Sequence, residues 1–448
     1  MLNEIFRLSL PLVIGQLSFA FMSFIDTLLM GQLGVESLAG GGLGSVVYQF
    51  FYIVGIGALV STASLIAFAK GREDDHEIHG ALLSGCILVV VLFFLFGGLI
   101  WNIKPILLSL GQVPETVNYA ERYLRVVVWA LLPAFGFILL RSLVVGVGRP
   151  AAILPVSIVA AVLNYPVSYA LMTGQFGLPV MGIEGVALGT CIISWLMFFG
   201  LVFLTYRQRA FSLFPFWSGW QDFSWKQFRE TLRLGLPIAI AHAMEVGMFS
   251  AAALLIGTLG VSALAAHQVA LQSTTLSFMI PLGISQAVSV KVGALYGAQQ
   301  LARVISVLKS GLFLGCISAG IAAIIFWFAP EFLVQVFLQS DSVVEADYVL
   351  VLLSATQILL VAAVFQFVDS WQVIIMGALR GFKLGLSPTA ASVVSYWCVG
   401  FPCSYFMKDV WGAAGVWAGM GVGLATSALI LVVLFRRELS IQRNKYAA

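Results

Sequence analysis

Three carboxylic acids lie in segments whose other residues are apolar. Asp26 stands in SFIDTLL, Glu245 in HAMEVGM and Asp369 in FQFVDSW, whereas the rest of the 20 acidic residues fall in loops or at the ends of apolar segments. An ionised carboxylate at the centre of a membrane-spanning helix costs about 2.5 to 3.5 kcal/mol on insertion scales, so it needs a partner, a water-filled cavity or a bound proton. We interpret the three acids as cation-coupling residues. The alternative is that backbone or basic groups bind each carboxylate for a structural reason.

Two ions fit such carboxylates. A carboxyl group in an apolar environment readily takes up a proton, whereas two carboxylates with carbonyl and hydroxyl oxygens nearby suit Na⁺. The residues themselves do not choose between H⁺ and Na⁺.

Other polar residues in apolar segments are weaker candidates. Asn164, in VLNYPVSY, precedes Pro166, and its amide could satisfy backbone groups that the proline leaves free. Gln268 and Gln272 follow His267 near the start of a later apolar segment. We take the two glutamines as candidate polar groups of a cavity and expect His267 to be a hydrogen-bond partner rather than a ligand.

The sequence contains no motif for soluble enzyme chemistry. It has no Gly-rich phosphate loop ending in Lys-Ser or Lys-Thr, no metal-ligand cluster and no nucleophile elbow. Each cysteine is expected to act as a small buried hydrophobic residue, because all five fall in apolar segments: Cys86, Cys191, Cys316, Cys398 and Cys403. We therefore expect no enzyme activity, no cofactor and no structural metal site.

The composition predicts a polytopic α-helical membrane protein. Of the 448 residues 60% are apolar and only 10% are charged, against about 25% charged residues in soluble domains. A spanning helix needs about 20 apolar residues, and long uncharged stretches of this kind recur along the chain. Their continuity excludes an outer-membrane barrel, whose strands alternate in polarity. We read the net charge of +3 as a topology signal, not as affinity for nucleic acid.

Hydropathy and Gly/Pro breaks predict twelve spanning helices. They lie near residues 7–34, 43–69, 81–103, 122–146, 151–173, 183–206, 232–259, 264–295, 304–329, 346–377, 385–407 and 412–435. With the N-terminus inside, only Lys104, Arg122, Arg125 and Lys408 fall on the outer side, and all other basic residues lie at or near the cytoplasmic face. The positive-inside rule therefore predicts that both termini are cytoplasmic, in the plasma (inner) membrane.

The sequence repeats itself with an offset of 226 residues. RLSLP at residues 7–11 returns as RLGLP at 233–237, and Gly57 and Gly71 correspond to Gly283 and Gly297. We therefore expect two homologous six-helix lobes, related by a pseudo-twofold axis along the membrane normal. The predicted domains are an N-lobe at 1–206, a cytoplasmic linker at 207–231 and a C-lobe at 232–448.

Two duplicated lobes are the architecture of a carrier, because lobes that rock about a seam can expose one cavity to each side in turn. The alternative is a duplicated scaffold that transports nothing. The offset places Ala252 opposite Asp26 and Phe19 opposite Glu245. The acids therefore have no acidic counterpart at the repeat-related positions, and we expect the two lobes to have different functions.

Five stretches resemble the multidrug and toxic compound extrusion (MATE) transporters, and within them the NorM-type branch. They are LSLPLVIGQL with FIDTLLMGQLG, LRSLVVGVGRP, LGLPIAIAHAMEVGMFS, LAAHQVAL and FQFVDSWQVIIMGALRG. They occur in order along nearly the whole chain.

The resemblance implies a secondary antiporter that exports organic, mainly cationic and amphipathic compounds while Na⁺ or H⁺ enters. It assigns Glu245 and Asp369 to a C-lobe cation site and Asp26 to an N-lobe coupling site. Asn164 matches an N-lobe asparagine, and Ser168 stands where many relatives have a second one. The implied partners are small organic cations and membrane lipids, and a single chain with both lobes is expected to work as a monomer.

Two other functions compete with drug export. A flippase for lipids or lipid-linked precursors would need a basic cavity for a phosphate, whereas the charges in the apolar segments singled out above are acidic. A polytopic membrane enzyme such as a prenyl transferase would need clustered Asp residues that hold Mg²⁺ on a diphosphate. The three acids are instead scattered over the first, seventh and tenth predicted helices.

Overall fold

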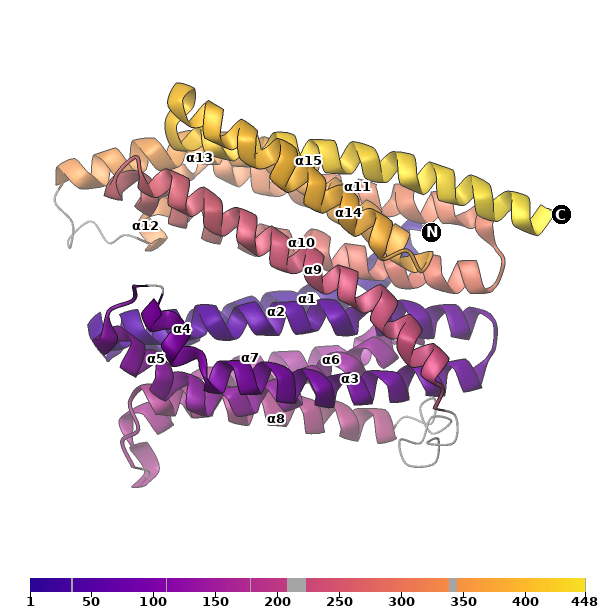
Figure 1. The fold of residues 1–448 in the computed structure, drawn as a ribbon, viewed down its shortest axis with the longest axis horizontal. Helices are drawn as coiled ribbons and strands as arrows, with labels where there is room; N and C mark the ends of the chain where they lie inside the picture. The colour runs from indigo at the N-terminus through magenta and orange to yellow at the C-terminus, as the bar shows by residue number, and fades with distance from the viewer. Residues whose placement is uncertain (34, 110, 178, 208–222, 338–344, 448) are drawn as a thin grey trace. The chain divides into compact units, whose positions relative to one another are not determined.

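The computed structural model describes residues 1–33, 35–109, 111–177, 179–207, 223–337 and 345–447, and within these ranges the chain is helical and has no strand (Figure 1). The first half contains α1 (Leu2–Gln32), α2 (Val35–Gly71), α3 (Asp75–Trp101), α4 (Ile103–Ser109), α5 (Pro114–Val127), η1 (Val128–Ala130), α6 (Leu131–Gly146), η2 (Pro150–Ala152), α7 (Ile153–Thr173), η3 (Gln175–Gly177) and α8 (Ile183–Arg207). The second half contains α9 (Trp225–Gly257), α10 (Val261–Gly297), η5 (Leu301–Arg303), α11 (Val304–Phe328), α12 (Pro330–Phe337), α13 (Glu345–Gly381), α14 (Leu386–Val394), the π-helical turn η7 (Ser395–Gly400) and α15 (Phe401–Ala447). A helix satisfies its own backbone groups, which lipid cannot do.

The described residues form eleven helical segments long and apolar enough to cross a membrane. The last of them, residues 386–444, is two spans, because Trp411 and Gly412 leave the helical conformation inside it. Gly412 has a φ of 57°, which favours glycine, and the chain turns back there (Figure 1). The prediction of a polytopic helical protein with twelve spans is confirmed.

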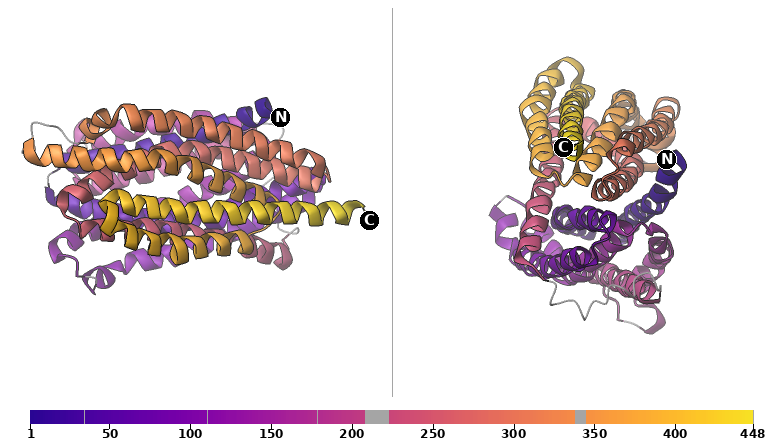
Figure 2. Two further views of the ribbon diagram at one scale, coloured as in Figure 1. Left: turned by 90° about the horizontal axis from the view of Figure 1, so that it is seen from above. Right: turned by 90° about the vertical axis from the view of Figure 1, so that its right-hand side faces the viewer.

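The helices repeat in the same order in both halves. α2 ends at Gly71 and α10 at Gly297, which is the offset predicted from the sequence. The short helices α4 and α12 follow the third span of each half, and hydropathy missed both because neither is long enough to cross a membrane. Within each half the long helices run alongside one another (Figure 2).

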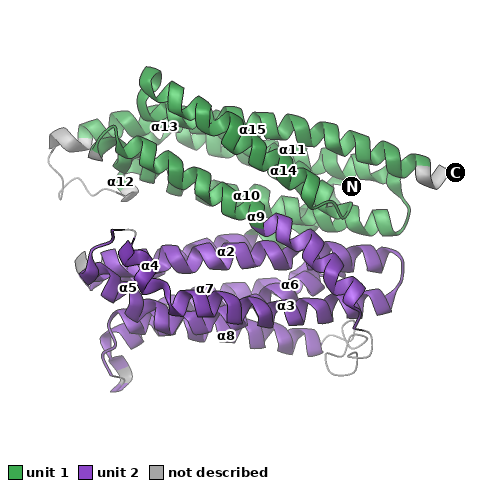
Figure 3. Ribbon diagram, viewed as in Figure 1, with its two compact units in different colours: residues 1–13, 240–448 green, residues 14–239 purple. Residues whose placement is uncertain are grey.

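Two compact units divide the chain (Figure 3). Unit 2 is Ile14–Ala239, and unit 1 consists of Met1–Val13 and Ile240–Ala448. Each boundary falls inside a helix, α1 or α9, just after the prolines of the repeated motif, Pro11 and Pro237. The first turns of α1 therefore belong with the second half, and those of α9 with the first.

Close contacts hold these first turns in place. In unit 1, Glu4 on α1 pairs with Lys291 on α10, and the backbone of Val13 approaches Gly283 closely. In unit 2, a Cβ atom on Gly235 would lie 2.2 Å from the carbonyl oxygen of Ala58. Only a residue without a side chain allows α9 to approach α2 at this point.

The predicted domain bounds of 1–206, 207–231 and 232–448 remain a prediction. Most of the proposed linker, residues 208–222, lies outside the described residues, and α9 already begins at Trp225.

Substitution of Gly235 by alanine is expected to destabilise the protein. In a helix interior alanine is normally about 1 kcal/mol more stabilising than glycine. Here the new Cβ would clash with the Ala58 backbone, and such overpacking costs about 1 to 3 kcal/mol. The thermal unfolding midpoint of the detergent-solubilised protein should fall. Gly42→Ala is the matched control, because a Cβ there meets no atom within 4 Å; an equal Tm change in both variants would contradict the close approach.

Candidate functional site

Asp26 on α1 is buried and hydrogen-bonded within unit 2. The residue is only 8% exposed. The Thr190 hydroxyl on α8 donates to Oδ2 at 2.7 Å, and the Asn164 amide on α7 donates to Oδ1 at 3.3 Å. Three helices thus bring one acid and two donors together, which provides the partners that a buried carboxylate requires.

A close approach of α7 and α8 positions the two donors. A Cβ on Gly189 would lie 2.1 Å from the Ser168 hydroxyl, so the missing side chain lets the helices meet beside Thr190. Ser168 is fully buried, but its hydroxyl has no hydrogen-bond partner among the described residues. Ser168 therefore packs at the helix contact and does not bind Asp26.

Thr190 is the member of this site that the sequence analysis missed. A hydroxyl next to a glycine in the apolar segment GTCIISW was the available signal.

The two acids of unit 1 lie on α9 and α13, two helices that line one pocket. Asp369 on α13 is 6% exposed, and its carboxylate accepts no side-chain hydrogen bond from the part of the chain that the structure describes. Glu245 on α9 repels this carboxylate electrostatically. Glu245 itself lies 3.6 Å from Nδ1 of His242, one turn earlier on α9.

The buried polar face of α13 extends beyond Asp369. Gln366 donates to the backbone oxygen of Thr274 on α10 at 3.2 Å. One turn after Asp369, Gln372 donates to the Ser392 hydroxyl at 3.3 Å, and Ser392 is 3.0 Å from the Ser427 hydroxyl. Polar side chains therefore recur along α13 at Gln366, Asp369 and Gln372, and the hydroxyls of Ser392 on α14 and Ser427 on α15 continue from Gln372. Carboxylate, amide and hydroxyl oxygens are the ligands that hard cations prefer.

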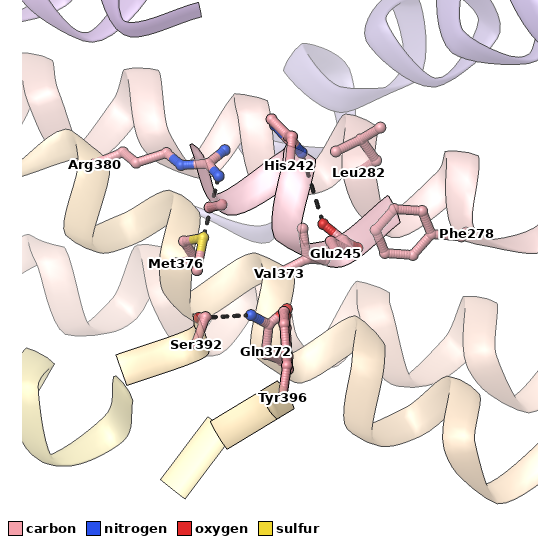
Figure 4. A pocket seen from close by; sticks show the side chains of 11 residues that line it. His242, Glu245, Phe278, Leu282, Gln372, Val373, Met376, Arg380, Ser392 and Tyr396 are labelled. Atoms are coloured by element: carbon pink, nitrogen blue, oxygen red, sulfur yellow. Dashed lines mark hydrogen bonds and ion pairs between the residues drawn. The ribbon is translucent and has the colours of Figure 1, made fainter. Parts of the chain in front are cut away.

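A pocket opens in unit 1 where α9, α10, α13, α14 and η7 meet (Figure 4). It is lined by Ala241, His242, Glu245, Phe278, Leu282, Gln372, Val373, Met376, Arg380, Ser392 and Tyr396. Most of these residues are outside the set predicted from the sequence; only Glu245 belonged to it. Asp369 is near Glu245 but is not among the lining residues.

Gln268 and Gln272, the predicted cavity glutamines, are exposed on α10 and are absent from this pocket. Their role stays a prediction. His267 is fully buried, and Nδ1 accepts a 3.0 Å hydrogen bond from the indole nitrogen of Trp417.

No group of three His, Cys, Asp or Glu residues that could hold a metal occurs among the described residues.

Comparison with known proteins gives a consistent result. The sequence model of the MatE family matches residues 11–170 and again residues 237–406, which covers most of the chain and confirms the duplication. The chain is 34% identical to the probable multidrug resistance protein NorM of Pseudomonas syringae pv. tomato, over 96% of this chain and 94% of that protein. It is 35% identical to the protein of the same name from Pseudomonas aeruginosa, over 97% and 89% of the two chains.

Solved structures share the fold. The eukaryotic MATE transporter AtDTX14 matches with a TM-score of 0.87 at 16% identity, covering 99% of this chain and 98% of that one. A MATE structure in the bent conformation matches with a TM-score of 0.88 at 19% identity, covering 99% and 97%.

Loss of the buried indole–imidazole hydrogen bond is expected to destabilise unit 1. Trp417→Phe removes the N–H donor and leaves Nδ1 of His267 unsatisfied, which costs about 1 to 3 kcal/mol in addition to lost packing. The measurement is the free energy of unfolding, or Tm, in detergent. In the double variant with His267→Leu the two losses should be less than additive; strict additivity would show that the hydrogen bond contributes nothing.

Proposed function

The chain belongs to the MatE family of membrane transporters, and from this premise we propose that it exports organic, mainly cationic amphipathic compounds in exchange for inward Na⁺ or H⁺. As a member of this family it is a multi-pass membrane transporter and not an enzyme. The drug-export assignment follows the curated relatives, which are called probable multidrug resistance proteins.

One observation carries the coupling proposal. Asp369 on α13 and Glu245 on α9 are two acids of unit 1 that repel each other electrostatically, and Asp369 has neither a basic partner nor a hydrogen-bond donor among the described residues. Two like charges in an apolar environment destabilise each other unless a cation or a proton reaches them. Binding of external Na⁺ or H⁺ at these acids is therefore strongly favoured over leaving them empty.

Asp26 supplies a second coupling position in unit 2. Its two hydrogen-bond donors stabilise the ionised form, so it gives up a proton or cation more readily than an acid without donors would. The two units thus contribute acids of different affinity.

The cycle needs unfavourable coupling between ion and drug. The external ion binds the acids of unit 1, which weakens drug binding, and the drug leaves; release of the ion to the cytoplasm restores drug affinity. Such coupling amounts to about 1 to 3 kcal/mol and is reciprocal. If saturating ion left drug affinity unchanged, competition could not drive export.

We place the protein in the plasma (inner) membrane with both termini cytoplasmic, following the distribution of its basic residues. A single chain holds both units, so we propose that the monomer, surrounded by lipid, is the functional form.

Neutralising Asp369 should abolish ion-driven export. In proteoliposomes, efflux of a fluorescent organic cation is measured under an imposed Na⁺ gradient and, separately, an imposed pH gradient. Asp369→Asn keeps the size of the side chain but removes the charge that binds the ion, so efflux should fall to the level of empty liposomes. Asp409→Asn is the matched control, because Asp409 is exposed and lies beside Lys408. If neither gradient drives dye efflux by the folded wild-type protein, the proposal fails and the lipid-flippase hypothesis is favoured.

Removing one donor to Asp26 should make this acid bind the coupling ion more tightly and release it less readily. Thr190→Val is nearly isosteric but deletes the 2.7 Å hydrogen bond, and hydrogen bonds to charged groups contribute about 1.5 to 3 kcal/mol. The ion concentration for half-maximal transport should fall about tenfold or more, because the ion-free carboxylate has lost a stabilising donor. Thr426→Val is the control, since that exposed hydroxyl bonds only its own helix backbone; equal shifts in both variants would refute a role for Thr190.

A further inference from the structure

Arg380 is a buried cation without an adequate partner. It lies at the end of α13 and is 9% exposed. One terminal nitrogen contacts the Met376 sulfur at 3.1 Å, and Nε has no hydrogen-bond partner in the described residues. A guanidinium carries five N–H donors, and a thioether is a weak acceptor. The side chain thus keeps unused donors in a place that water reaches poorly.

The surrounding groups do not supply the missing acceptor. Arg380 lines the pocket of Figure 4 together with His242 and Glu245 from α9 and Tyr396 from η7. Glu245 is the acid of this pocket and attracts Arg380 electrostatically, but it lies 3.6 Å from His242, and the described part of the chain shows no ion pair within 4 Å between Glu245 and Arg380. Gln372, an amide of the same pocket, donates its Nε2 to Ser392, and no hydrogen bond from Arg380 to the Gln372 oxygen occurs among the described residues.

We propose that Arg380 is the recognition site for a carboxylate carried by the transported compound. A planar guanidinium binds a carboxylate through two parallel hydrogen bonds, and such bidentate pairs are geometrically specific. The site explains both observations, because a bound carboxylate would supply the acceptor that Nε lacks and would neutralise the buried charge. This inference rests on the proposed function and names a residue that selects among its substrates.

The pocket carries charges of both signs. Glu245 lies within the same lining as Arg380 (Figure 4), and Phe278 and Leu282 add apolar surface from α10. The volume of the pocket is only about 20 Å³, so the carboxylate enters it and the rest of the compound stays outside. Arg380 then distinguishes compounds that carry a carboxylate beside the cationic group from compounds that carry the cationic group alone.

A matched pair of dyes tests the assignment. Rhodamine B carries a free carboxylate beside its cationic ring system, and rhodamine B ethyl ester keeps the cation but lacks the carboxylate. Equilibrium binding of each dye to the purified, detergent-solubilised protein is followed by fluorescence anisotropy. In Arg380→Gln the ratio of the two dissociation constants, rhodamine B over ester, should rise about tenfold or more, because a charge-assisted bidentate contact is lost.

Two further variants complete the test. Arg303→Gln makes the same charge change at an exposed arginine that bonds Gln300, and it should keep the wild-type ratio. Arg380→Lys retains the charge but lacks the paired N–H donors of the guanidinium, so the ratio of dissociation constants should rise only severalfold. If Arg380→Gln does not fold, Arg380→Lys is measured in its place. An unchanged ratio in folded Arg380 variants, or equal weakening of both dyes, overturns the proposal. Because binding is read without any gradient, this outcome is separate from a failure of ion-driven export.

Discussion

A charge inside a bundle of apolar helices must be hydrogen-bonded, paired or neutralised by a ligand, and the two units meet this constraint in different ways. In unit 2 the protein itself supplies the partners, since Thr190 and Asn164 both donate to Asp26. In unit 1 it leaves the requirement partly open at Asp369 and at Nε of Arg380. Unsatisfied buried charge costs several kcal/mol, and that cost is recovered when a ligand binds. The open groups are therefore the ones best able to turn ion or substrate binding into free energy that favours one state over another.

Duplication provided the scaffold but not this chemistry. The helices recur in order with an offset of 226 residues through the first spans, and the same family model matches both halves. Yet the offset places Phe19 opposite Glu245 and Ala252 opposite Asp26. A symmetric pair of sites would bind the ion with one affinity. In the proposed cycle, asymmetric acids allow one position to bind the ion tightly while the other exchanges it, so the cycle requires the two halves to differ.

Hydropathy and glycine breaks predicted the spans well, including the turn at Gly412, because insertion into lipid is decided by local composition. They could not place the unit boundaries inside α1 and α9, since those depend on close contacts such as Gly235 with Ala58. Asp26 and Asn164 were predicted separately and meet in the structure. Thr190 and Arg380 were not predicted as site residues: a threonine is unremarkable in an apolar helix, and a basic residue at a helix end is read as a topology signal. Which way a side chain turns from a helix end is set by tertiary packing.

Because Arg380 and Glu245 line one pocket, they also affect how strongly the binding of ion and substrate is coupled. A coupling ion at Glu245 adds positive charge there, which repels a cationic group entering the same pocket and so favours exchange of one for the other. The same ion attracts a carboxylate bound at Arg380. For a zwitterion the two effects oppose each other, and the net coupling is smaller than for a simple cation. Because coupling is reciprocal, a substrate's own charge distribution then determines how strongly it responds to the ion gradient, and a single pocket can export many compounds with unequal efficiency.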